Sequence, residues 1–232
     1  MEGRGALVTG GGTRVGRAIA EKLAALGADV AVHYLTSEKG ANEVVAAAKV
    51  DGNKAVALKA DLTAADPAPL VAQAVEALGN LSILVNSAGV MGARFSADEL
   101  WKVNARAPLL LTEAFAARGG EGDVVNVLDV AGVWGHWREH TAYCMSKAAA
   151  AEATRCLALK LAPRIRVNGV APGTVLPPEG MSAEELEKIR SRVPQGRLGS
   201  PKDVAEVVAM LLTGPSFMTG QIVAVDGGRS LA

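Results

Sequence analysis

The 232-residue sequence has few aromatic residues, only two cysteines and no excess of charge of either sign. Its 24 basic and 24 acidic residues form no long run of one sign, so it lacks the electrostatic features of a protein that binds nucleic acid or an anionic membrane. No apolar stretch reaches membrane-spanning length. We therefore expect neither nucleic acid nor a membrane as a partner.

The cysteines and the first residues carry expectations about the compartment. The chain begins MEGRGALVTG, without the basic segment and following apolar stretch of an export signal. Cys144 and Cys156 fall in one expected helix, more than three turns apart and too far apart for a disulfide. We expect reduced thiols in a cytoplasmic protein.

Half of the residues are hydrophobic, and short apolar runs alternate with longer stretches of helical periodicity. The short runs are typical of strands buried on both faces, at residues 5–9, 29–34, 54–60, 81–89, 123–129, 165–173 and 221–228. The longer stretches predict helices, at residues 14–26, 37–50, 67–78, 97–117, 142–161, 183–192 and 202–213. The pattern predicts an α/β fold: a single doubly wound parallel sheet of the Rossmann type with helices on both faces.

The sequence shows no repeat, low-complexity tract or linker, so residues 1–232 are expected to form a single domain. Ligands of such sheets bind beyond the carboxyl ends of the strands. Functional residues are therefore expected in the loops at that edge. The stretch near residues 174–195 contains a pair of prolines and an acidic helix with a capping box at Ser182 and Glu185, and we expect it to be a substrate lid.

A glycine-rich segment, TGGGTRVGRAIA at residues 9–20, joins the first strand to the first helix. Backbone amides in such a turn can approach a pyrophosphate, and the helix N-terminus adds favourable partial charge. Tight turns use glycine in any case, so the signal comes from the position of the turn after the first strand. The expected cofactor contacts are Gly10, Thr13, Arg14, Val15 and Gly16.

The end of the second strand indicates which nicotinamide cofactor is used. An NAD site usually has an acidic residue there for the ribose hydroxyls, whereas this segment reads HYLTS, without an acid. Arg14 near a 2′-phosphate, with His33, Thr36 and Ser37 as hydrogen-bond donors, fits NADPH. In the alternative reading, Arg14 is a solvated turn residue.

Tyr143 and Lys147 are spaced i, i+4 and project from one face of a helix. A free tyrosine has a pKa of about 10, and a nearby ammonium lowers that value by favouring the phenolate. The pair is therefore a candidate proton donor and its partner. The alternative is an ordinary amphipathic pair on a surface helix.

Several motifs occur together and in order: the glycine-rich turn, Asp61 after the third strand, NSAG at 86–89, Asn104, YxxxK at 143–147, APG at 171–173 and DGG at 226–228. In this combination the chain resembles the short-chain dehydrogenase/reductase family along essentially its whole length. NSAG departs mildly from the family's usual NNAG.

The resemblance implies roles for individual residues. Asn104, Tyr143 and Lys147 match three of the four catalytic positions: Asn104 would hold a proton-relay water, Lys147 would bind the nicotinamide ribose, and Tyr143 would protonate the substrate. The cofactor would be lined by Asn86, Ala88, Gly89, Pro172 and Gly173, with Asp61 and Leu62 against the adenine.

Two departures resemble the pteridine reductase branch of the family. Arg14 replaces the middle glycine of the turn, and Asp129 stands where the family has its catalytic serine. The HYLTS segment also resembles that branch. Protozoan pteridine reductases stack the substrate on a phenylalanine shortly after the NNAG-type loop, and here Met91 takes that place.

The replacement of serine by Asp129 has chemical consequences. A carboxylate opposes the oxyanion of a carbonyl reduction but stabilises a protonated C=N, and it can accept two N–H bonds from the amino-bearing edge of a pterin. The alternative is that Asp129 ends the strand and caps a turn.

Two of the three tryptophans, Trp134 and Trp137, fall close together and would form either a wall for a flat substrate or a subunit contact. The family resemblance implies a homotetramer built with helices such as 97–117 and 142–161. We expect a small-molecule substrate and no metal. The alternatives are a carbonyl reductase of the 3-oxoacyl-thioester type and, third, a non-catalytic NADPH sensor, which is disfavoured because Asn104, Tyr143 and Lys147 are all present.

Overall fold

The computed structural model describes residues 1–135, 137–177 and 180–232. Within these ranges the strands form one parallel seven-stranded sheet in the order β3-β2-β1-β4-β5-β6-β7. The strands are β1 (Gly5–Val8), β2 (Asp29–Tyr34), β3 (Ala55–Lys59), β4 (Leu81–Asn86), β5 (Gly122–Val127), β6 (Ile165–Pro172) and β7 (Ile222–Val225). The expected doubly wound α/β fold is confirmed.

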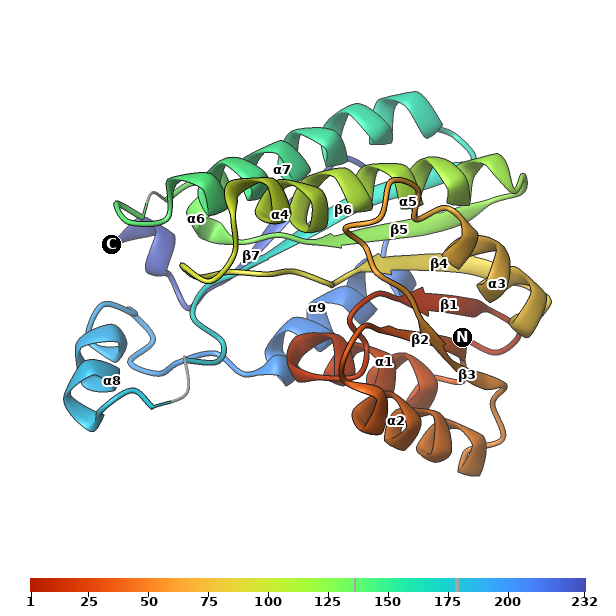
Figure 1. Ribbon diagram of the computed structural model, residues 1–232, viewed down its shortest axis with the longest axis horizontal. Coiled ribbons are helices and arrows are strands. Elements are labelled where there is room, and N and C mark those ends of the chain that lie inside the picture. Colours follow the sequence, from red (N-terminus) through yellow and green to blue (C-terminus); the bar gives the residue numbers. More distant parts are fainter. Residues whose placement is uncertain (136, 178–179) are drawn as a thin grey trace.

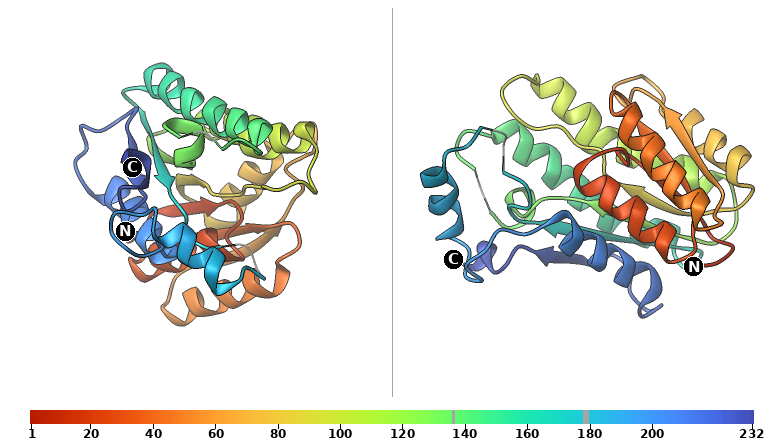
Figure 2. Two further views of the ribbon diagram at one scale, coloured as in Figure 1. Left: turned by 90° about the vertical axis from the view of Figure 1, so that its left-hand side faces the viewer. Right: turned by 90° about the horizontal axis from the view of Figure 1, so that it is seen from below.

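Helices cover both faces of the sheet (Figures 1 and 2). One face carries α1 (Arg14–Ala25), α2 (Glu38–Val50) and α9 (Pro201–Thr213), and the other carries α3 (Pro69–Leu78), α5 (Ala107–Ala117) and α7 (Thr141–Leu161). In β1, Ala6 and Val8 pack into the first core and Leu7 into the second. Burial on both faces explains why the inner strands are continuous apolar runs, whereas the edge strands β3 and β7 are only partly buried.

Some elements differ from the sequence-based prediction. The expected helix 97–117 is made of α4 (Ala97–Trp101), the π-helical segment η1 (Lys102–Arg106) and α5. A short helix, α6 (Val130–Val133), follows β5 and was not predicted. The last strand was predicted too long, because Gly227 and Gly228 have positive φ and turn the chain into η2 (Arg229–Leu231).

The order of the strands reverses between β1 and β4, and ligands of doubly wound sheets bind at that point, outside the carboxyl ends of the strands. The turn after β1 and the loop after β4 both lie there. Figure 1 shows α8 (Ala183–Arg190), within the expected lid, standing apart from the sheet on the same side as α6. Its predicted capping box is present, with Ser182 and Glu185 bonded reciprocally.

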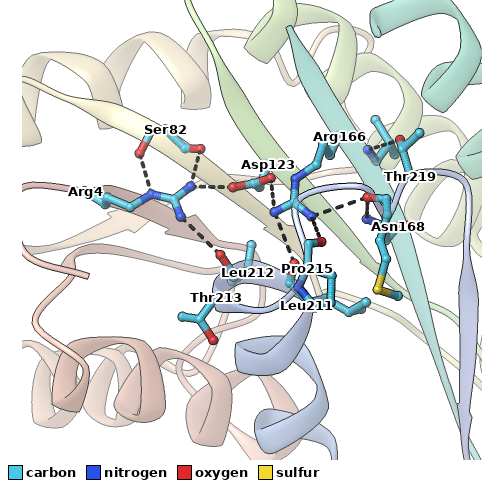
Figure 3. A network of polar contacts seen from close by, with 12 residues as sticks. Arg4, Ser82, Asp123, Arg166, Asn168, Leu211, Leu212, Thr213, Pro215 and Thr219 are labelled. Carbon is cyan, nitrogen blue, oxygen red and sulfur yellow. Dashed lines mark hydrogen bonds and ion pairs between the residues drawn. The ribbon is translucent and has the colours of Figure 1, made fainter. Parts of the chain in front are cut away.

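An ion-pair network links several elements at the amino ends of the strands, opposite the expected site (Figure 3). The Asp123 carboxylate on β5 lies 2.6 Å from Arg4 and 2.7 Å from Arg166. The same guanidinium groups donate to the carbonyls of Leu212 and Leu211 at the end of α9. These carbonyls lack partners within the helix. The network therefore joins the end of α9 to Arg4, just before β1, and to β5 and β6, far from the expected site.

Candidate active site

Tyr143 and Asp129 form the centre of the candidate site. Tyr143 lies in the first turn of α7, and Asp129 lies between β5 and α6. The phenol donates a hydrogen bond to Oδ2 of Asp129 at 2.8 Å. The structure therefore brings together the expected proton donor and the residue expected to replace the family's serine.

Asp129 also caps a helix. Its Oδ1 accepts a hydrogen bond from the Ala131 amide at 2.8 Å, as the N-cap of α6. The capping role considered for this residue is thus real, and it coexists with the contact to Tyr143. By holding one oxygen of the carboxylate, the cap orients the other toward the phenol.

Lys147 lies one helical turn after Tyr143 and is buried. Its ammonium donates to the Val127 carbonyl at the end of β5, at 3.0 Å. Burial lowers the pKa of Lys147, and the charge of Asp129 opposes part of that effect. The Lys147 ammonium therefore lies at the carboxyl end of β5, next to the candidate site.

The pKa of Tyr143 is opposite in direction to the sequence-based expectation. Burial raises it well above its ordinary value, and the Asp129 carboxylate raises it further. The expected lowering by Lys147 is wrong for this arrangement, because the phenol bonds to an anion while the ammonium bonds to a carbonyl. Burial also raises the pKa of Asp129. Tyr143 is therefore protonated at neutral pH.

Asn104 lies in the π-helical segment η1, a feature often found at functional sites. Its side chain accepts from the Val90 amide and donates to the Val90 carbonyl, both at 2.9 Å, and also donates to Ser146 on α7. A Cβ at Gly89 would lie 3.4 Å from both Asn104 Oδ1 and Lys147 Nζ. Asn104 and Lys147 thus flank Gly89, while the expected relay water stays a prediction.

The glycine-rich turn has the shape needed for close approach of a phosphate. A Cβ at Gly16 would lie 2.2 Å from the Gly10 carbonyl oxygen, so only glycine fits at the start of α1. No side chain caps the N-terminus of α1 at Thr13, which leaves the amides of the first turn, including that of Val15, for an anion. These residues fit a dinucleotide pyrophosphate.

Arg14 has a φ of 52° and is the one non-glycine residue with positive φ among those the structure describes. Glycine adopts positive φ at no steric cost, so this conformation fits the expectation that the family has a glycine at this position. Its exposed guanidinium donates to the Leu176 carbonyl at 3.2 Å, joining the turn to the expected lid. Pro178 and Glu179, within that lid, lie outside the described residues.

The expectation that His33 donates to a cofactor phosphate is corrected by the structure. The side chain is buried, and both ring nitrogens have protein partners: Nδ1 accepts from the Gly10 amide and Nε2 bonds to the Ala60 carbonyl. Thr36 is exposed and Ser37 partly exposed after β2. These two therefore remain the candidate donors of that segment.

The residues expected around the adenine and the nicotinamide are at the same edge of the sheet. Asp61 is exposed and accepts two hydrogen bonds from Thr63, while Leu62 is buried in the core. Pro172 ends β6, and a Cβ at Gly173 would collide with Asp226.

The loop after β4 is held by a residue that sequence reasoning did not single out. Thr9 Oγ1 accepts from the amides of Ser87 and Ala88, at 2.9 and 3.0 Å. The Asn86 side chain points into the core instead, where it donates to Asn126. The position of Thr9, at the head of the glycine-rich turn, was the available signal.

Trp137 stacks on Tyr143, with ring centroids 6.0 Å apart and an interplanar angle of 18°. Of the two expected wall tryptophans, this one is therefore adjacent to the centre of the site. Trp134 and Met91 are 45% and 40% exposed. Both are therefore exposed enough to make the expected substrate contacts.

Within the described ranges, no helix is long and apolar enough to cross a membrane, and no cluster of three or more typical metal-ligating side chains occurs. Cys144 and Cys156 both lie on α7 and are unbridged, as expected.

Comparison with known proteins defines the family. A family model described as enoyl-(acyl carrier protein) reductase matches residues 12–230. An uncharacterized oxidoreductase from Methylorubrum extorquens is 38% identical, with 98% of each chain covered. L-Rhamnose 1-dehydrogenase (NAD(P)(+)) from a Sphingomonas species is 33% identical over 98% of this chain and 96% of the relative. The chain belongs to the short-chain dehydrogenase/reductase family.

Two solved structures have the same fold. FolM alternative dihydrofolate reductase 1 from Brucella canis, complexed with NADP, is 34% identical with a TM-score of 0.92, over 99% of this chain and 95% of that one. A blue fluorescent protein from a metagenomic library, in complex with NADPH, is 31% identical with a TM-score of 0.91, over 98% of each chain. These findings support the expected class, an NADP-dependent short-chain oxidoreductase.

Proposed function

We propose that the protein reduces a C=N bond of a pteridine-type substrate, such as a dihydropterin or dihydrofolate, with NADPH. The observation that carries the proposal is the hydrogen bond between Tyr143 and Asp129. The similarity to a structure described as an alternative dihydrofolate reductase supports the same substrate class.

The reaction adds a hydride to carbon and a proton to nitrogen of the C=N bond. NADPH supplies the hydride when bound. Tyr143 supplies the proton from its phenol, which the raised pKa keeps protonated. A phenol of raised pKa is a weak acid, so a basic nitrogen is a better acceptor for its proton than a carbonyl oxygen.

Asp129 favours the same substrate class on electrostatic grounds. Its carboxylate lies beside the donated proton and stabilises a cationic C=N nitrogen, whereas it would oppose negative charge on an oxygen. Each carboxylate oxygen has two acceptor sites. One site on each is used by Tyr143 and Ala131, which leaves capacity for the amino-bearing edge of a pterin.

Binding of NADPH is proposed at the carboxyl edge of β1, β2 and β4. The amides of Thr13, Arg14 and Val15 would hold the pyrophosphate, and Arg14 with Thr36 and Ser37 the 2′-phosphate. Gly89, between Asn104 and Lys147, would lie at the nicotinamide side. Trp137, stacked on Tyr143, would form one wall for the flat substrate.

A second candidate is reduction of a 3-oxoacyl thioester. A granaticin polyketide synthase putative ketoacyl reductase from Streptomyces violaceoruber is 36% identical over 97% of this chain and 96% of the relative. In that reaction Asp129 would face the developing oxyanion, which is unfavourable.

A direct comparison of substrates tests the proposal. NADPH oxidation is followed with dihydrobiopterin, dihydrofolate, a quinonoid dihydropterin and an acetoacetyl thioester. We expect kcat/KM on the best pteridine to exceed that on the thioester by at least about tenfold, or roughly 1.4 kcal/mol in transition-state free energy. A preference for the thioester would overturn the pteridine proposal in favour of the second candidate.

We also propose a homotetramer. Large apolar side chains are exposed on the helices that the family resemblance assigns to subunit contacts, with Trp101 at the end of α4 and Met145 and Leu159 on α7. Light scattering after size-exclusion chromatography should give a mass near four chains, and a monomeric mass would refute it.

A further inference from the structure

His33 is a buried histidine that makes three contacts with its surroundings near the end of β2. Its Nδ1 accepts from the Gly10 amide at 3.1 Å, its Nε2 bonds to the Ala60 carbonyl at 3.1 Å, and its own carbonyl accepts from the Gly11 amide at 2.9 Å. The side chain is 2% exposed. One residue thus joins the glycine-rich turn to the end of β3.

These contacts determine the protonation state of the ring. Because Nδ1 accepts a hydrogen bond, it carries a lone pair; Nε2 then carries the proton and donates to Ala60. Only this neutral tautomer satisfies both partners. A protonated ring would direct an N–H toward the N–H of Gly10.

We infer that His33 is a positioning residue for the cofactor: it turns the amides of Gly10 and Gly11 inward and thereby fixes the start of α1 for the dinucleotide phosphates. This inference rests on the use of a dinucleotide cofactor and is independent of the proposed pteridine substrate.

Close packing around Gly10 explains why the position of this one amide matters. A Cβ at Gly10 would lie 3.0 Å from Ala88 Cα, so the glycine is pressed against the loop after β4. Gly10 is also pressed against the start of α1: a Cβ at Gly16 would lie only 2.2 Å from the Gly10 carbonyl oxygen. A displacement of Gly10 is therefore transmitted directly to the first turn of α1, whose amides remain for the pyrophosphate.

The bond to Ala60 extends the effect to the adenine side. Ala60 directly precedes Asp61 and Leu62, the residues that the family resemblance places against the adenine. Since β2 and β3 pair in parallel with His33 opposite Leu58, the ring reaches Ala60 from its own strand. His33 thus sets the distance between the phosphate and adenine parts of the expected site.

Burial holds the ring in its neutral state. Desolvation lowers the pKa of His33 and the bond to Ala60 opposes it, while no charged group contributes. The titratable groups on the adjoining segments are Arg14 in the turn, Lys59 and Asp61 around Ala60, and Glu38 at the start of α2.

Three substitutions separate this role from simple core packing. His33→Asn keeps an acceptor at the place of Nδ1 and loses the contact with Ala60. His33→Gln reaches toward Ala60 but has no acceptor at the place of Nδ1, and His33→Leu removes both. NADPH binding to the full chain is measured by fluorescence titration without substrate, and stability by urea unfolding.

We expect His33→Asn to keep the NADPH Kd within about threefold of wild type, and His33→Gln and His33→Leu to raise it by about tenfold or more. If His33 served only core packing, the NADPH Kd of each variant would instead rise in proportion to its loss of unfolding free energy. His33→Asn would then bind NADPH no more tightly than His33→Gln. That result, or an unchanged Kd in His33→Leu, would overturn the inference. If His33→Leu does not fold, the comparison of Asn with Gln decides.

A pH series provides a second readout. Because burial lowers the pKa of His33 below its ordinary value of about 6.5, protonation should weaken NADPH binding by the wild type more than by His33→Asn only in more acidic buffer, below about pH 6.5. The 2′-phosphate also titrates near about pH 6, so His33→Asn at each pH is the matched reference. A wild-type curve that diverges from that of His33→Asn already above about pH 6.5, or that stays parallel to it down to the lowest pH at which both proteins remain folded, would contradict the role of the Nδ1 lone pair.

Discussion

The phenolic oxygen of Tyr143 lies 2.8 Å from Oδ2 of Asp129 and donates its hydrogen bond to that carboxylate. The phenol is therefore kept protonated by the same group that would stabilise a cation on the substrate. A site with a weakly acidic donor and a neighbouring carboxylate suits a basic nitrogen as the proton acceptor.

Replacing Tyr143 by Phe should lower kcat on the physiological substrate by on the order of a hundredfold or more, because the proton donor is lost. The NADPH Kd should change little, since the phenyl ring still packs against Trp137. Steady-state kinetics and a fluorescence titration measure the two quantities. Turnover near that of wild type would refute the assignment of Tyr143.

Replacing Lys147 by Ala should affect both quantities. The ammonium beneath the site is expected to contact the nicotinamide ribose, so its removal should raise the NADPH Kd as well as lower kcat. Lys147→Met is the matched control, because it keeps most of the buried aliphatic stem and loses only the charge. NADPH binding at wild-type strength in both variants would exclude the ribose contact.

The acid-free end of β2 and the guanidinium of Arg14 predict a preference for the phosphorylated cofactor. NADPH should bind at least about tenfold tighter than NADH, a difference of about 1.4 kcal/mol. Equal dissociation constants for the two cofactors would count decisively against this prediction.

Arg14→Gly should raise the free energy of unfolding but weaken the binding of NADPH relative to NADH. Glycine relieves the positive φ of 52° and should raise the unfolding free energy by up to about 1 kcal/mol, while loss of the guanidinium should reduce the preference for NADPH. Arg14→Ala loses the same charge without relieving the backbone. The prediction fails if Arg14→Gly keeps the full preference for NADPH.

The raised pKa of Asp129 predicts that its ionised form lowers the free energy of unfolding, to an extent that depends on pH. Because its folded pKa lies above the unfolded value, the residue favours folding most when protonated, and that contribution is lost as the pH rises through the folded pKa. Asp129→Asn keeps an acceptor for the Ala131 amide and carries no charge. It should be more stable than wild type at pH 7, by a margin that shrinks in acid; a margin that is constant with pH would contradict this.

Much of the fold could be predicted because its signals are local. Apolar runs predicted the strands, and helical periodicity over residues 14–26 predicted α1. Helical periodicity did not predict the π-helical segment, within which Asn104 bonds to Val90 and Ser146, residues distant from it in the sequence.

The residues of the candidate site could be predicted from the sequence, whereas the surroundings of their side chains could be predicted only in part. The resemblance to the family placed Tyr143, Lys147 and Asp129 together. The direction of the Tyr143 pKa depends on which neighbour its hydroxyl contacts, and the role of His33 depends on the pairing of β2 with β3, so both emerged only in three dimensions.

The most direct test of the account is the effect of Asp129→Ser on two substrate types. Losing a charge-assisted interaction costs roughly 1.5–3 kcal/mol, so kcat/KM on a dihydropterin should fall by about ten- to a hundredfold. The variant's kcat/KM on an acetoacetyl thioester should be equal to or higher than that of wild type. A wild-type enzyme that prefers the thioester, and loses that activity in Asp129→Ser, would show that Asp129 serves carbonyl chemistry and would contradict the account.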